Sequence, residues 1–353
     1  MTDTTTYVDI RLLSLPVRNP LRTAHDREVS DTRDLVVVQL ETAQGSGWGE
    51  CSALNQPNYS PEHARGAYEL LSRTSLIDPL VAPMAHAALE MAKLDMTLKA
   101  SRESLATYLG AGREWVTAGV AVGLSALNAT LDDISALADE GFTRVKLKVV
   151  PGPSVAIVQE VRQRFPDVEL QVDANGSFTS NSLDDLMTMV QAGVTAVEQP
   201  FAVGDLISLR ALTDVTEVPI VADESVATVT DARELYEAGL LRAISLKASR
   251  LGGLRAALAL QTLCIEWGVA LTAGGMLECG LGRHALVALA ATPGFNITGD
   301  VSPARRWLAA DPWPDLAMAD GRIRVPTGPG VAPEPDMELL DRFTVQRTLR
   351  TQK

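Results

Sequence analysis

A strand-like segment that ends in a charged residue recurs through the middle of the chain about every two dozen residues. The segments are VKLKV, LQVDAN, AVEQP, PIVADES and AISLKAS, all between residues 143 and 275. The spacing is 25 residues from Lys148 to Asp173, to Glu198 and to Asp223, and 24 residues from Asp223 to Lys247. One strand, one helix and two short loops take about that many residues, so a constant spacing places the same layer of each unit at the same height. We therefore expect these five side chains to converge.

The segments are rich in Val, Ile and Leu, and they alternate with helix-like stretches such as PSVAIVQEVRQRF and DARELYEAGLL. This alternation predicts parallel strands wrapped by helices, and with this number of units it predicts a closed β/α barrel. EWVTAGVAVGL is expected to be the first barrel strand, and VALTAGG and NITGDV the last two. Active sites of such barrels lie at the C-terminal ends of the strands, where the charged residues fall.

Residues 1–115 are predicted to form a separate α+β domain. YVDIRLLSLPVR, DLVVVQLETAQG and GSGWGECSAL alternate like the strands of an antiparallel meander, and two helical stretches follow them. A polar connection at about 19–33 is too long for a tight hairpin, so it is either a loose loop or a lid over the barrel mouth. The barrel is expected over residues 116–302, and residues 303–353 are expected to return to the first domain.

Composition argues against several classes of protein. The net charge is −13, and we find no cluster of Lys and Arg that would mark a nucleic-acid surface. No apolar run is long enough to span a membrane, and the start MTDTTTYVDI lacks the features of a secretory signal, so a cytoplasmic location is expected. Cys51, Cys264 and Cys279 show no metal or redox spacing, and a packing role is favoured over a nucleophilic Cys279. The sequence does not decide whether the chain forms a homo-oligomer.

Three carboxylates, Asp173, Glu198 and Asp223, follow successive predicted strands and are the hard oxygen ligands that suit Mg²⁺. Each signal has an alternative when taken alone. The lysines of VKLKV could lie on a solvent-facing strand, and an Asp after a strand could cap the next helix. Glu198 before Gln-Pro is a poor cap, however, and nothing structural explains carboxylates and lysines that are all in phase. We therefore predict a Mg²⁺ site flanked by lysines.

The motifs VKLKV, QVDAN, VEQP, ADES, SLKASRLGG and GGMLECGLGR, in this order, resemble those of the enolase superfamily, in its muconate lactonizing enzyme subgroup. More narrowly, the chain resembles the branch of o-succinylbenzoate synthases and N-acylamino acid (N-succinylamino acid) racemases. The resemblance runs nearly end to end, from LRT and GWGECSAL to PGFNITGD and VPTGPG.

This resemblance implies an α/β fold, a modified (β/α)7β TIM-like barrel with an N-terminal α+β capping domain and its lid near residues 22–33. It implies Mg²⁺, with Mn²⁺ as a substitute, held by Asp173, Glu198 and Asp223. Lys148 and Lys247 are the implied acid/base residues on opposite faces of the substrate. The further residues implied near the substrate or in support of the site are Lys146, Asn175, Glu224, Arg250, Gly274, Gly275, Met276 and Glu278.

The chemistry of these residues agrees with such roles. Removing a proton next to a carboxylate builds up negative charge that a divalent cation and an ammonium group can neutralise. Lys148 can serve as a base because Lys146 and a bound metal ion are cationic neighbours that disfavour its proton. Arg250, three residues after Lys247, is expected to act on that lysine in the same way. The alternative for Arg250 is a pair with a surface carboxylate.

The expected substrate is therefore a small carboxylate. Synthase activity, a syn dehydration in menaquinone synthesis, is the favoured reaction, with racemisation of N-acylamino acids as a second or replacement activity. Dipeptide epimerase, muconate-type cycloisomerase, a Schiff-base aldolase using Lys247 and a non-catalytic metabolite-binding barrel are the alternatives. Ala121 and Ala248 stand where relatives often have Ser and Pro, and these changes bear on the substrate rather than on the chemistry.

Overall fold

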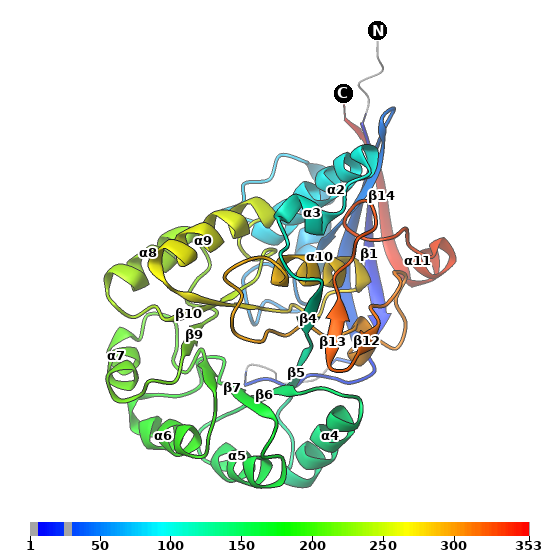
Figure 1. Ribbon diagram of the computed structural model, residues 1–353. Helices are drawn as coiled ribbons and strands as arrows, with labels where there is room; N and C mark the ends of the chain where they lie inside the picture. The colour runs from blue at the N-terminus through cyan, green and yellow to red at the C-terminus, as the bar shows by residue number, and fades with distance from the viewer. Residues whose placement is uncertain (1–5, 25–29, 353) are drawn as a thin grey trace.

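A computed structural model describes residues 6–24 and 30–352 of the chain. Figure 1 shows a curled sheet with helices around it and, beside it, a flatter sheet that contains the first and the last described strand of the chain. The flatter sheet has the strand order β14-β1-β2-β3 and is antiparallel throughout. Its strands are β1 (Thr6–Pro16), β2 (Thr32–Thr42), β3 (Gly45–Cys51) and β14 (Thr344–Gln352). The predicted meander of the first three strands is confirmed.

Helices α1 (Ala64–Arg73) and α2 (Pro83–Ser101) cover one face of this capping sheet, and the short α3 (Leu105–Leu109) follows them. Val8, Ile10 and Leu12 alternate along β1 and are buried in a cluster that includes residues of both α1 and α2. A Cβ atom at Gly49 would lie 1.9 Å from the carbonyl oxygen of Ala88. The glycines of GSGWGEC therefore allow α2 to lie directly on β3.

The second sheet has seven parallel strands in the order β11-β10-β9-β8-β7-β6-β5. They are β5 (Gly119–Val122), β6 (Arg144–Lys148), β7 (Glu169–Asp173), β8 (Ala196–Glu198), β9 (Ile220–Ala222), β10 (Ala243–Leu246) and β11 (Ala270–Ala273). The connecting helices are α4 (Leu127–Asp139), α5 (Pro153–Arg164), α6 (Leu183–Gln191), α7 (Leu206–Val215), α8 (Val229–Glu237), α9 (Leu254–Trp267) and α10 (Gly280–Ala290). Figure 1 shows α4 to α9 arranged around the outside of these strands. The predicted α/β class is confirmed, and the predicted barrel is present as a curled sheet of seven parallel strands with an antiparallel capping sheet beside it.

Two details differ from the expected strands. EWVTAGVAVGL divides into β4 (Trp115–Thr117) and β5, and β4 belongs to a small sheet with β12 (Met318–Ala319) and β13 (Arg322–Arg324). NITGDV is not a strand, although it lies between β11 and β5, since Asp300 N–H donates to Ala273 O (2.8 Å) and Gly119 N–H donates to Val301 O (3.0 Å). A Cβ atom at Gly299 would lie 2.5 Å from Ala273 O, so a glycine is needed where this segment passes β11.

The remaining elements are two short 3₁₀ turns, η1 (Ser180–Ser182) and η2 (Ala304–Arg306), and α11 (Met337–Phe343), which leads into β14. β14 pairs with β1 from Thr6 opposite Gln352 to Leu13 opposite Thr344. Residues 25–29 of the predicted lid lie outside the described residues. The adjoining Arg22 is anchored on the barrel, because its carbonyl accepts a hydrogen bond from Leu124 N–H (2.8 Å). The boundaries predicted near residues 115 and 302, and the lid itself, stay predictions.

Within the described ranges, the helices lack the combination of length and hydropathy needed to cross a bilayer.

Candidate active site

The strand ends bring the five spaced side chains together. Lys148 pairs in register with Asp173, and Asp173 pairs with Glu198, so these three residues end neighbouring strands at one level. Asp223 directly follows β9, and Lys247 directly follows β10. The three carboxylate residues are at most 2% exposed. A parallel sheet built from units of equal length thus gathers acidic and basic side chains at one buried edge.

Each lysine is held by carboxylates. Lys146 Nζ donates to Glu198 Oε2 (2.8 Å) and to Asp300 Oδ2 (2.6 Å), and it lies 3.5 Å from Asp173 Oδ2. Lys148 Nζ donates to Asp173 Oδ2 (2.7 Å). The sequence reasoning missed Asp300, which also accepts from Arg144, although an acidic residue at the end of NITGDV was a usable signal. Both lysines of VKLKV therefore point toward the acidic cluster and away from solvent.

Burial and charge set the protonation of this cluster. Burial, reinforced by the neighbouring Asp173 and Asp223, raises the pKa of Glu198 to about 8 despite the opposing charge of Lys146. For Lys146 burial acts to lower the pKa, but the charges of Asp300 and Glu198 outweigh it and raise the pKa above its usual value. Of the three carboxylates, Glu198 is thus the one whose pKa is raised, whereas the pKa values of Asp173 and Asp223 are lowered.

The carboxylates of Asp173, Glu198 and Asp223 are chemically suited to bind a divalent metal ion. Glu198 Oε1 is buried and has no hydrogen-bond partner within the described residues, so one carboxylate oxygen is available as a ligand. In residues 6–24 and 30–352, no three His, Cys, Asp or Glu side chains are arranged as a metal centre. Asp173, Glu198 and Asp223 are each paired with the ammonium group of a lysine. Three buried carboxylates remain a hard donor set that fits Mg²⁺.

Asp223 connects the second lysine to the capping domain. Lys247 Nζ donates to Asp223 Oδ2 (2.8 Å), and Arg250 donates to Asp223 Oδ1. The hydroxyl of Tyr59, in the connection between β3 and α1, donates to Asp223 Oδ1 (3.0 Å) and accepts from Lys247 Nζ (3.0 Å). Arg250 is thus paired with a buried carboxylate rather than a surface one. Nothing near Tyr59 in the sequence indicated a site, because the contact joins residues 164 positions apart.

These contacts also set the ionisation of the second lysine. Burial lowers the pKa of Lys247, and Arg250 acts in the same direction, but the charge of Asp223 outweighs them. The pKa of Lys247 is therefore raised well above its usual value. Burial would raise the pKa of Asp223, yet the charges of Lys247 and Arg250 hold it below the usual range.

The other predicted residues surround this cluster. Asn175 accepts from Lys148 Nζ (2.9 Å) and donates to Glu224 Oε1 (3.0 Å), and burial together with Asp223 raises the pKa of Glu224 to about 7. A Cβ atom at Gly274 would lie 2.7 Å from Lys247 Cγ, so a glycine is needed beside that lysine. Gly275 and Met276 line the cavity described below, and Glu278 accepts from the backbone N–H of Met276 (2.8 Å).

Buried polar contacts join the capping sheet to the segment from Met276 to the first turn of α10. The guanidinium of Arg33 donates to Ser52 O (2.7 Å) in the capping domain and to Met276 O (3.1 Å) in the barrel. Glu50 of β3 accepts from Gly282 N–H (2.9 Å) in the first turn of α10 and from the thiol of Cys279 (3.1 Å). Burial and Glu50 raise the pKa of Cys279 well above its usual value, which disfavours a nucleophilic thiolate.

A cavity of about 210 Å³ lies between the capping domain and the barrel. Lys148 and Lys247 both line it, together with Tyr59 and the described parts of the predicted lid. A smaller space of about 60 Å³ adjoins it and is lined by Lys146, Asp173 and the same two lysines. The cavity therefore places two basic side chains and the acidic cluster around one space large enough for a small carboxylate.

Comparisons with known proteins agree with this architecture. The family described as enolase C-terminal domain-like matches residues 129–339. An N-succinylamino acid racemase from Amycolatopsis sp. is 35% identical, covering 96% of this chain and 97% of the relative, and an o-succinylbenzoate synthase from Bacillus subtilis (strain 168) is 33% identical, covering 96% and 95%. The solved structure of a probable mandelate racemase from Alicyclobacillus acidocaldarius superposes with a TM-score of 0.87 at 31% identity, covering 99% of each chain.

A curled parallel sheet with acidic strand ends, covered by an antiparallel capping sheet, is the architecture of an enolase-type enzyme. The chain belongs to the enolase superfamily, in the branch that contains the o-succinylbenzoate synthases and N-succinylamino acid racemases. Members of this superfamily generally use a divalent metal ion.

Proposed function

We propose that the chain is a Mg²⁺-dependent enzyme that removes the α-proton of a small carboxylate substrate. The favoured reaction is that of an o-succinylbenzoate synthase, a syn dehydration in menaquinone biosynthesis, with racemisation of N-succinylamino acids as a second activity. The observation that carries the proposal is that Lys148 and Lys247, on strand ends separated by β7, β8 and β9, line the same cavity. Two lysines on opposite sides of one space can reach both faces of a substrate carbon.

Asp173, Glu198 and Asp223 are the residues that would hold the metal ion. A bound Mg²⁺ supplies positive charge that offsets the negative charge developing on the substrate carboxylate. Lys148 would then take the α-proton, and Lys146, which is 2% exposed, adds a fixed charge beside it. Arg33, Asn55 and Tyr59 of the capping domain line the same cavity as the two lysines.

The two reactions make different demands on Lys247. Dehydration needs one base, and the opposite lysine serves as a cation near the developing charge. Racemisation needs both lysines to gain and to lose a proton, because the proton leaves from one face and returns on the other. Arg250 acts to lower the pKa of Lys247, which supports a role for this arginine in the second reaction.

An assay of the purified protein with Mg²⁺, against the cyclohexadiene hydroxy-carboxylate substrate of the synthases and a panel of N-succinylamino acids, tests the proposal. We expect dehydration, accompanied by racemisation of at least some panel members. Racemisation without dehydration would identify a racemase with no synthase role. Absence of both activities would overturn the proposed reaction.

A further inference from the structure

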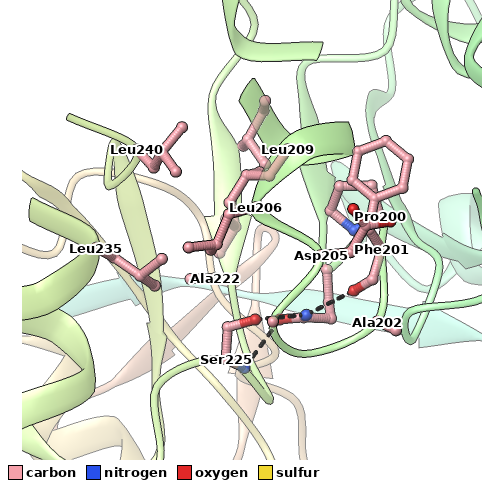
Figure 2. A pocket seen from close by; sticks show the side chains of 14 residues that line it. Pro200, Phe201, Ala202, Asp205, Leu206, Leu209, Ala222, Ser225, Leu235 and Leu240 are labelled. Carbon is pink, nitrogen blue, oxygen red and sulfur yellow. Dashed lines mark hydrogen bonds between the residues drawn. The ribbon is translucent and has the colours of Figure 1, made fainter. Parts of the chain in front are cut away.

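A small apolar cleft lies between the parallel sheet and helices α7 and α8 (Figure 2). The cleft is lined by four leucines, Leu206, Leu209, Leu235 and Leu240. On another side, Figure 2 shows Ser225 and Phe201, and the dashed hydrogen bonds connect both of them to the side chain of Gln199. Among the described residues, the cleft shares no lining residue with the catalytic cavity. Gln199, the residue after Glu198, makes the drawn hydrogen bonds and is 4% exposed.

The amide group of Gln199 uses its full hydrogen-bonding capacity. Its Oε1 accepts from the backbone N–H groups of Asp223 (3.0 Å) and Ser225 (3.1 Å). Its Nε2 donates to Phe201 O (2.8 Å) and to Ser225 Oγ (2.7 Å). A primary amide has two donor hydrogens and two acceptor lone pairs, so each has a partner here. A carboxylate lacks the donors, and Asn is one methylene too short to span the same groups.

The backbone of Gln199 also makes hydrogen bonds, to the loop after β7 and to β9. Its carbonyl accepts from Gly176 N–H (2.7 Å) in the loop after Asp173, and its own N–H donates to Val221 O (2.9 Å) in β9. The residue has φ +37°, a left-handed conformation that is unfavourable for a side chain other than glycine. Gln199 therefore follows the middle carboxylate and is hydrogen-bonded to the segments that carry the two outer ones.

From these contacts we infer that Gln199 is a positioning residue that sets the relative placement of Asp173, Glu198 and Asp223 and thereby the affinity of the site for Mg²⁺. The inference rests on the proposed metal site. Residues that orient metal ligands through hydrogen bonds typically change metal affinity by about 10- to 100-fold when they are replaced. The amide acts on the backbone that carries the ligands and does not itself contact the ion.

The test is direct titration of Mg²⁺ into the substrate-free protein by calorimetry, for wild type, Gln199→Met and Gln199→Glu. We expect both variants to bind Mg²⁺ at least about tenfold more weakly than wild type. Gln261→Met is the matched control, since Gln261 is also buried and its Nε2 donates to Thr292 Oγ1 (2.8 Å) and to Pro293 O, neither of which belongs to the acidic cluster. It should lower the melting temperature without weakening Mg²⁺ binding.

Wild-type Mg²⁺ affinity in the Gln199 variants, or an equal loss in Gln261→Met, would overturn the inference. Should the Gln199 variants not fold, Ser225→Ala removes one partner of the amide with little disturbance. A weaker Mg²⁺ affinity at an unchanged melting temperature would then support the inference, and an unchanged affinity would overturn it. Failure of the wild-type protein to bind Mg²⁺ would instead overturn the proposed metal site, a result that is distinct from any of these.

Discussion

The pKa values of individual carboxylates in this protein depend on the charged groups around them. Glu198 and Asp223 are both buried at strand ends, yet the pKa of Glu198 is raised to about 8 while that of Asp223 is lowered. Asp223 is paired with two cations, Lys247 and Arg250, whereas Glu198 has only Lys146 and keeps one oxygen without a partner in the described structure. Of these carboxylates, Glu198 therefore has the least positive charge around it, and a bound cation would stabilise its ionised form the most.

At this scale we predict that Glu198→Gln abolishes Mg²⁺-dependent turnover. Loss of one group that helps to neutralise developing charge costs about 10²- to 10³-fold in kcat, and loss of a metal ligand should cost at least that much. Chelation of the wild-type protein should have the same effect and be reversed by added Mg²⁺. Glu160→Gln, on the surface of α5 beside Arg164, is the control and should keep full activity. Full activity in a thoroughly chelated preparation would show that the carboxylates serve another purpose.

A second prediction at this scale concerns Arg250. Its replacement by Gln removes a fixed positive charge that favours the deprotonated form of Lys247, so racemisation should fall more than dehydration, by roughly tenfold for each unit of pKa change. Parallel measurement of kcat for both reactions gives the ratio. Equal losses in the two reactions, or none in either, would show that Arg250 does not tune the lysine.

At the scale of elements, the strands could be predicted much better than the contacts between them. The spacing of Lys148, Asp173 and Glu198 indicated their common level because parallel units of equal length repeat along the chain. Tyr59 could not be found that way, since its contact with Asp223 depends on how the capping sheet sits on the barrel. NITGDV has the residues of a strand, but it makes only scattered hydrogen bonds with β11 and β5 and is not a strand. The contact of Tyr59 and the conformation of NITGDV both depend on packing between distant segments, which local sequence patterns do not encode.

The contact between β3 and α10 leads to a prediction about pH. Burial, with a contribution from Glu278, raises the pKa of Glu50 from an ordinary 4.5 to about 7. The folded protein thus binds this proton more tightly than the unfolded chain, so the stabilisation is complete below pH 4.5 and is lost as pH rises to 7. The free energy of unfolding of wild type minus that of Glu50→Gln should fall by up to about 3 kcal/mol across this interval. Denaturant unfolding at pH 5 and pH 8 measures the difference, and a constant difference would contradict the prediction.

At the scale of the whole molecule, the cavity lined by Lys148 and Lys247 is formed by two parts of the chain. The barrel contributes Lys148 and Lys247, and the capping domain contributes Tyr59 and Arg33, whose guanidinium donates to Met276 O. The chain has a net charge of −13, but its charge at the cavity is locally mixed, with lysines from both sides of the acidic cluster. The overall charge therefore says little about what the site binds, whereas the placement of two lysines around one space bears directly on the reaction.

The central claim is that Lys148 and Lys247 act on opposite faces of one substrate carbon. Proton exchange in deuterated water, followed by NMR separately for each enantiomer of an N-succinylamino acid, tests it most directly. Wild type should incorporate deuterium at the α-carbon of both enantiomers. Lys148→Ala and Lys247→Ala should each block exchange of one enantiomer, a different one in each variant, or stop turnover altogether. Wild-type exchange of both enantiomers in both variants would contradict the claim.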